Sequence, residues 1–134
     1  MVVTLKIVVG LIGLYLIAIA GMWMLMPETV SVQFGITLNG VQGLSTGRGD
    51  IGGMFLATGI LCLLGLRNHE SASVFLYSGS IILGAIALGR LVGFVTDGLV
   101  AMTVVPFVVE LGFVVAMCGL AYLYGRRNSH QVEK

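Results

Sequence analysis

The sequence predicts an all-α membrane protein, a bundle of four transmembrane helices with the N-terminus and the C-terminus in the cytoplasm. Three observations predict it. Hydrophobic residues make up 57% of the chain and charged residues only 10%, whereas a soluble domain carries about a quarter charged residues. Four apolar runs are each about long enough to cross a hydrocarbon core of ~30 Å. Basic residues are distributed unequally between the connections, which gives the orientation.

The first predicted span covers residues 5–26, and Pro27 ends it. Lys6, the apolar run and Ala18-Ile19-Ala20 also fit a secretory signal peptide with a small-residue cleavage site. We favour a span because the apolar run continues well past that motif. Trp23, near the end of the run, is expected to anchor in the lipid headgroup region.

Residues 27–48 are predicted to form an interfacial loop. Within it, residues 30–39 alternate between apolar and polar, a period that suits a strand with one apolar face. A single strand in lipid would leave backbone groups unpaired, so a short helix after Pro27 is the alternative, and both interpretations stay open. In either form we expect this segment at the membrane interface, where it would cover the bundle.

The other spans of this single membrane domain, residues 1–134, are predicted at residues 49–66, 73–95 and 99–124. Proline is tolerated in the first turn of a helix. Pro106 therefore allows the fourth helix to begin near Val105, or earlier with a kink. Gly125 is expected to end that helix, which leaves residues 125–134 as a cytoplasmic tail.

Small residues recur at four-residue spacing in the predicted spans, a pattern that lets helices pack closely in lipid. The positions are Gly49 and Gly53, Ser80 and Gly84, Ala85, Gly89 and Gly93, and Gly112 and Ala116. Most of them are expected to serve packing within the bundle. A surplus face on the third span could make a homo-oligomer.

The orientation follows from the lysines and arginines. With four spans, the basic residues on one side are Lys6, Arg67, Arg126, Arg127 and Lys134. The opposite connections, residues 27–46 and 96–98, contain no lysine or arginine. Because basic residues are retained on the cytoplasmic side, both termini are predicted to be cytoplasmic.

This topology places five ionisable residues in the outer half of the bundle, and these are the candidate site: Arg48, Asp50, Arg90, Asp97 and Glu110. Charges there are costly, so they pair, line water or serve a function. The third and fourth spans are antiparallel, which brings Arg90 and Glu110 within about one helical turn in depth. We predict an ion pair between them. Asp97 lies on the same helix face as Arg90 and could share it.

Several function classes are not favoured. A net charge of +1 argues against a nucleic-acid partner. No Ser/His/Asp or Cys/His arrangement is available, so we expect no enzyme activity, no cofactor and no metal site. Cys62 and Cys118 fit buried packing positions. Residues 47–52 match GxGxxG, but no strand precedes them, so dinucleotide binding is not expected. The methionines could bind Cu(I), although they more often fill gaps in cores.

Short motifs at five places carry a family resemblance: Arg48-Gly49-Asp50, Gly52-Gly53, Gly89-Arg90, Asp97-Gly98 and Glu110-Leu111. The pattern resembles a family of small bacterial four-span membrane proteins classified only as a domain of unknown function, and more remotely DoxX-like proteins. The positions that carry the match are Arg48, Asp50, Gly53, Arg90, Asp97 and Glu110. The resemblance implies a multi-pass protein of the bacterial inner (plasma) membrane and implies no activity.

Three function hypotheses follow. In the first, the protein contacts membrane lipid and binds a small or lipidic ligand, or a partner subunit, through the polar cluster. Arg48 and Arg90 would face an anionic group, and Asp50 and Glu110 would orient them. In the second, it is an oligomeric proton- or cation-coupled transporter of small molecules with Glu110 as the coupling carboxylate. In the third, the cluster only fixes the bundle of a structural subunit.

Overall fold

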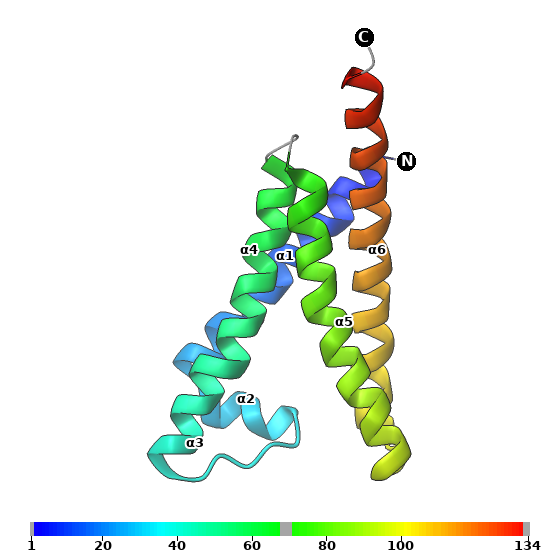
Figure 1. The fold of residues 1–134 in the computed structure, drawn as a ribbon. Coiled ribbons are helices and arrows are strands. Elements are labelled where there is room, and N and C mark those ends of the chain that lie inside the picture. Colours follow the sequence, from blue (N-terminus) through cyan, green and yellow to red (C-terminus); the bar gives the residue numbers. More distant parts are fainter. Residues whose placement is uncertain (1, 68–70, 133–134) are drawn as a thin grey trace.

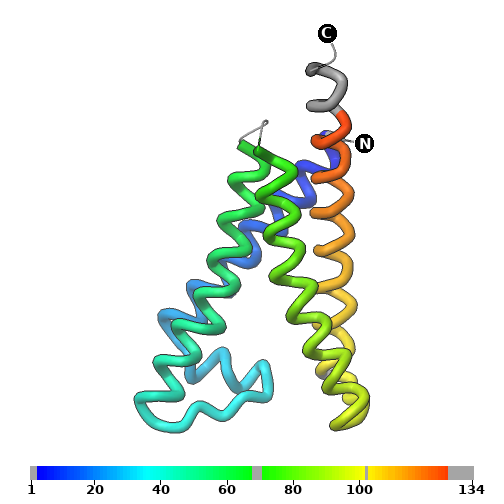
Figure 2. The backbone as a smooth tube through the Cα atoms, in the orientation of Figure 1, coloured from blue at the N-terminus to red at the C-terminus, as the bar shows by residue number. Residues whose placement is uncertain are grey.

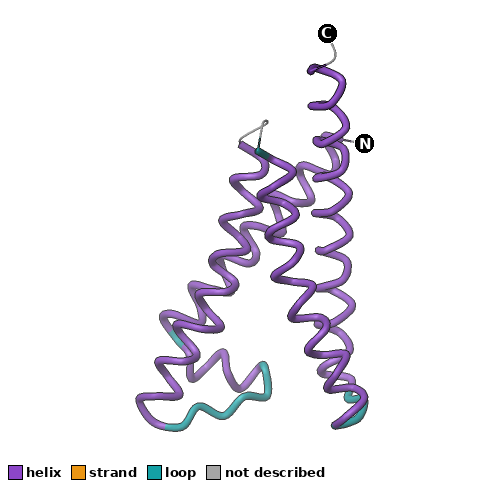
Figure 3. The backbone as a smooth tube through the Cα atoms, viewed as in Figure 1, coloured by secondary structure: helices purple, strands orange, loops and turns teal. Residues whose placement is uncertain are grey.

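The computed structural model describes residues 2–67 and 71–132, and within these ranges it contains helices and short connections but no strand. Four helical segments are long and apolar enough to cross a membrane, as predicted. The elements are α1 (Val2–Leu25), α2 (Pro27–Gln33), α3 (Gly40–Thr46), a π-helical segment η1 (Gly47–Gly52), α4 (Gly53–Arg67), α5 (Ala72–Thr96) and α6 (Ala101–Val132). Figure 1 labels the α-helices, and Figure 3 shows the short connections between them.

The long helices form two antiparallel pairs. α1 packs against α4, α5 packs against α6, and contacts between α4 and α5 join the pairs. Figures 1 and 2 show the pairs close together at the end that carries both termini and diverging towards the end that carries α2. The chain therefore crosses up and down four times, and both termini lie at the same end of the molecule.

The second span begins earlier than predicted. α3, η1 and α4 form one continuous helical segment from Gly40 to Arg67, whereas the sequence suggested a start at residue 49. The glycines here make room for a ring. A Cβ atom at Gly47 or at Gly52 would lie 3.2 Å from the side chain of Trp23. The π-helical turn in this segment is a form that often marks functional sites.

The helix of the fourth span differs from the predicted span, residues 99–124, at both ends. α6 begins at Ala101, so the earlier of the two predicted starts is the observed one, and Pro106 lies inside the helix. The prediction that Gly125 ends it is wrong, because α6 continues to Val132. A glycine that ends a helix commonly adopts positive φ. Gly35 and Gly98, which follow the ends of α2 and α5, have positive φ, and Gly125 does not.

The connection after α1 contains a helix. The alternation of apolar and polar residues at 30–39 had also allowed a strand there. α2 covers Pro27–Gln33 with proline at its first turn, and Ser31 Oγ donates to the carbonyl of Glu28 at 3.0 Å. The strand interpretation of this part is therefore wrong, and the helix alternative is confirmed. A proline at the first position favours a helix, and a helix satisfies its own backbone groups beside lipid.

The core contains the one tryptophan of the chain. Trp23 is fully buried, and its ring lies 5.6 Å from that of Phe34, centroid to centroid. The prediction that Trp23 anchors in the headgroups is wrong. Because η1 extends the second span past Trp23, Gly47 and Gly52 cover a side chain that would otherwise face the interface.

A close approach between two helix backbones lies at a glycine that the four-residue spacing did not identify. A Cβ atom at Gly59 would lie 2.8 Å from the carbonyl oxygen of Gly13, at the crossing of α1 and α4. Open space surrounds the predicted packing positions Gly49, Gly53, Gly84, Gly89 and Gly112. The spacing identified possible faces but not the face that meets a partner helix. A homo-oligomer through α5 stays a prediction.

Candidate functional site

The candidate site is built around one ion pair between α5 and α6. Arg90 Nε donates to both carboxylate oxygens of Glu110, at 3.0 Å to Oε1 and 2.9 Å to Oε2. The Glu110 side chain is 9% exposed and the Arg90 side chain 23%. The predicted pair is confirmed, with the carboxylate as its more buried member.

The local sequence explains this register. A short connection with Gly98 at φ +94° joins α5 to α6 and sets the two helices side by side. One turn from the ion pair, the rings of Phe94 and Phe107 meet edge to face at 5.2 Å between centroids. Since residues four and three apart share a helix face, this contact fixes the depth at which Arg90 meets Glu110.

Arg90 keeps most of its hydrogen-bonding capacity. A guanidinium carries five N–H donors, and only the Nε donor is used in the ion pair. In the described part of the chain, no group accepts a hydrogen bond from the two terminal nitrogens. Four donors are therefore available at the edge of a pair that is largely removed from water.

These donors border a cleft between the two helix pairs. It has two lobes of about 180 and 580 Å³, both lined by residues from α1, the α2 connection, α5 and α6. The residues common to both lobes are Tyr15, Ile19, Phe34, Arg90 and Pro106. Glu110 lines the smaller lobe, and Gln33 and Thr103 line the larger one.

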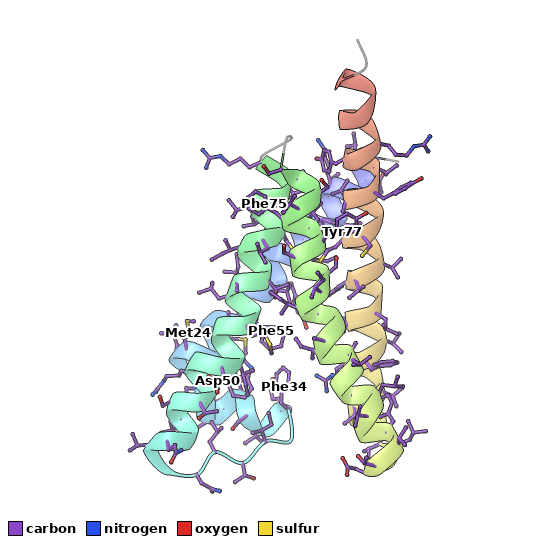
Figure 4. The ribbon with its side chains drawn as sticks, in the orientation of Figure 1. Met24, Phe34, Asp50, Phe55, Phe75 and Tyr77 are labelled. Atoms are coloured by element: carbon purple, nitrogen blue, oxygen red, sulfur yellow. The ribbon has the colours of Figure 1, made fainter. Side chains whose placement is uncertain are left out.

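Aromatic rings form much of the cleft wall. Phe34 and Phe55 lie next to each other on the side of the α1/α4 pair that faces α5, with centroids 6.4 Å apart (Figure 4). Tyr15 on α1 meets Phe113 on α6 edge to face at 6.0 Å between centroids. The cleft wall is thus mainly apolar, and Arg90 is the charged residue common to both lobes.

The other predicted site residues do not join the pair in one cluster. Asp97 lines a neighbouring hollow of about 180 Å³ that shares Arg90, Val100 and Thr103 with the larger lobe of the cleft. Arg48 lies on η1 and donates from Nε to the carbonyl oxygen of Met24 at 3.1 Å. Asp50 is exposed on the same turn, in the α1/α4 pair (Figure 4). Within the described ranges, the ion pair between Arg90 and Glu110 is the one that forms among these five residues.

Sequence reasoning missed the apolar lining of the cleft. Tyr15, Ile19 and Met22 follow one another at helical spacing on α1 and all line it. That spacing identifies a face, but every face of a transmembrane helix is apolar, so a lipid-facing row and a cleft-facing row look alike. Phe34 was missed because the segment from residue 28 to residue 46 carried none of the family resemblance.

The four long apolar helices define a multi-pass integral membrane protein of the four-helix class. The family model described as "Domain of unknown function (DUF4345)" matches residues 4–123, and the chain belongs to this family. This agrees with the resemblance seen in the short motifs, while the relation to DoxX-like proteins stays a prediction. Comparison with curated proteins and with solved structures gave no match.

Proposed function

We propose that this membrane protein has a binding role without catalysis, and that it holds a lipophilic molecule in the cleft by hydrogen bonds from Arg90. One observation carries the proposal: the terminal nitrogens of Arg90 have no acceptor in the described chain, and Arg90 lines both lobes of a mainly apolar cleft. Sites for small molecules combine apolar walls with a few placed polar groups. The Arg90 side chain is 23% exposed, and its unused donors border a mainly apolar space, so a bound acceptor would stabilise this arrangement.

Charge indicates the ligand class. Glu110 already balances the positive charge of Arg90. An anionic ligand would leave a net negative charge in an apolar space, which is unfavourable. A neutral molecule with a carbonyl oxygen, such as a diacylglycerol, would accept from Arg90 without adding charge. The proposal therefore replaces the expected anionic group with a neutral acceptor.

The test measures retention of two lipids by the purified full-length protein, diacylglycerol and oleate, by native mass spectrometry. We expect the wild type to retain diacylglycerol over oleate. Glu110→Gln leaves Arg90 without a counter-charge and should reverse the preference. The double variant Arg90→Gln/Glu110→Gln should retain diacylglycerol about tenfold less, since a hydrogen bond to a charged donor is worth at least that factor.

Asp50→Asn is the matched control, because Asp50 is an acidic residue at the same end of the bundle as Glu110 and does not line the cleft. It should behave as the wild type does. Equal retention of both lipids by the wild type, or an unchanged preference in Glu110→Gln, would reject the binding proposal. The pair would then be a structural one that fixes the bundle.

Proton or cation coupling by Glu110 is the second candidate, and the burial of Glu110 at the smaller lobe supports it. Intramembrane acids commonly serve in proton relays. Binding is the better-supported function because both oxygens of Glu110 accept from Arg90 Nε, which holds the carboxylate in place. Loss of proton movement in proteoliposomes with Glu110→Gln, with lipid retention unchanged, would favour coupling instead.

We also propose the bacterial inner membrane as the location, with both termini in the cytoplasm. The support is the absence of lysine and arginine from residues 27–46 and 96–98, together with the basic residues of the opposite connections. Alkaline phosphatase fused after Lys134 should be inactive, and phosphatase inserted between Leu38 and Asn39 should be active. The reverse pattern would invert the topology.

A further inference from the structure

A second hollow lies where α1 ends, and it is separate from the cleft. It has a volume of about 300 Å³ and is bounded by the last residue of α1, the start of α2, and residues of α3 and η1. It shares no lining residue with either lobe of the cleft. The residues that decide its chemistry are Arg48 and Glu28, which both line it.

Arg48 is fixed in this hollow by its own backbone contact. Its Nε donates to the carbonyl oxygen of Met24 at 3.1 Å, and the last carbonyls of a helix have no intrahelical donor. The contact therefore caps α1 and holds the guanidinium at the hollow. No described group accepts from its terminal nitrogens, so two N–H₂ groups remain for a ligand.

Glu28 brings the opposite charge from another element. It lies in the first turn of α2, where its backbone carbonyl accepts from Ser31 Oγ. Among the described residues, no ion pair within 4.0 Å joins its carboxylate to Arg48 or to another cation. One positive and one negative group thus line the same hollow without neutralising each other directly.

The depth of the hollow indicates what reaches it. We infer its depth from α1, whose apolar run ends at Leu25. This end places the hollow at the level of the lipid headgroups. Leu25 and Met26 line it and are 80% and 53% exposed. They offer an apolar surface in the same hollow as the two charges, which could contact the glycerol and the first methylene groups of a lipid.

We propose that this hollow binds the headgroup of a zwitterionic phospholipid with a primary amine, that is, a phosphatidylethanolamine. The phosphate would accept from the terminal nitrogens of Arg48, the geometry that arginine favours for phosphate. The ammonium would donate to the carboxylate of Glu28. A choline headgroup has no N–H donor, and the hollow has no aromatic ring among its described lining residues to receive a quaternary ammonium.

The experiment uses the full-length protein in detergent with equal amounts of phosphatidylethanolamine, phosphatidylcholine and phosphatidylglycerol. Native mass spectrometry then measures which lipid remains bound. We expect the wild type to retain phosphatidylethanolamine about tenfold over phosphatidylcholine. Glu28→Gln should remove this preference and raise retention of the anionic phosphatidylglycerol. Arg48→Gln should lower retention of all three.

Asp50→Asn is the control, since Asp50 belongs to the same turn as Arg48 but does not line the hollow. It should keep the wild-type preference. The proposal would be overturned if the wild type retained the three lipids equally. It would also be overturned if Glu28→Gln and Asp50→Asn retained them in the same ratio. Should Arg48→Gln fail to fold because α1 loses its cap, Glu28→Gln still decides, as the Glu28 carboxylate holds no described contact. The outcome does not depend on the cleft.

Discussion

Arg90→Gln is expected to lower the free energy of unfolding by about 2–5 kcal/mol, the cost of removing one partner of a buried charge pair. The Glu110 carboxylate, with a side chain 9% exposed, would lose both hydrogen bonds from Arg90 Nε. Its charge would then be left without a partner where α6 packs against α5. For a chain of this length, such a loss corresponds to a Tm decrease of about 10 °C. Thermal unfolding of the purified protein in detergent measures it.

The double variant Arg90→Gln/Glu110→Gln separates charge from packing. Two amides in place of the two ions can hydrogen-bond to each other, so most of the stability should return, to within about 1–2 kcal/mol of the wild type. Glu110→Gln alone should cost less than Arg90→Gln, because the Arg90 side chain is 23% exposed and borders the cleft. Wild-type stability in Arg90→Gln, or a double variant as unstable as the single one, would contradict this account.

The ion pair could be predicted from the sequence because depth along a helix is simple geometry. Each residue of an α-helix advances 1.5 Å, and the turn near Asp97 fixes where two antiparallel helices begin to face each other. Counting residues from that turn gives the depths of Arg90 and Glu110. The order of the spans, rather than this counting, predicted Arg48 and Asp50 at the same end of the bundle, and Figure 4 shows Asp50 at the end that carries α2.

Lateral position could not be predicted in the same way. Arg48 and Asp50 belong to the α1/α4 pair, whereas Arg90 and Glu110 belong to the α5/α6 pair. In water, the apolar face of a helix shows which side meets its neighbours. In lipid, that difference is lost, since the surroundings of the bundle are as apolar as its interior. The sequence therefore placed the five charges at one level without showing that they separate into two groups.

Glycine was ambiguous for a related reason, since the same residue ends helices and lets them approach. Gly125 was expected to end α6 and lies inside it. Gly49 was expected to pack against a helix and lies in open space, whereas Gly47 and Gly52 pack against Trp23. Only the neighbours of a glycine distinguish these roles. At Gly59 the nearest atoms include the backbone of α1, which cannot turn aside as the end of a side chain can.

Gly59→Ala is therefore expected to destabilise the α1/α4 pair. The added Cβ would lie 2.7 Å from Ile17 Cγ1 and 2.8 Å from the carbonyl oxygen of Gly13. A side-chain end could turn away, but a carbonyl belongs to the backbone of α1, so the two helices must separate. We expect a loss of about 1–3 kcal/mol, as for other overpacked sites, although alanine is the better helix former by about 1 kcal/mol.

Gly84→Ala is the matched control, because it makes the same change inside α5 where no atom lies within 4 Å of the added Cβ. There the helix propensity acts alone, and we expect stability unchanged or raised by up to about 1 kcal/mol. The two variants should therefore shift the Tm in opposite directions in the same detergent. If Gly59→Ala matched Gly84→Ala, α1 and α4 would not be held together at this crossing, and the wall of the cleft formed by Tyr15 and Ile19 would lose its support.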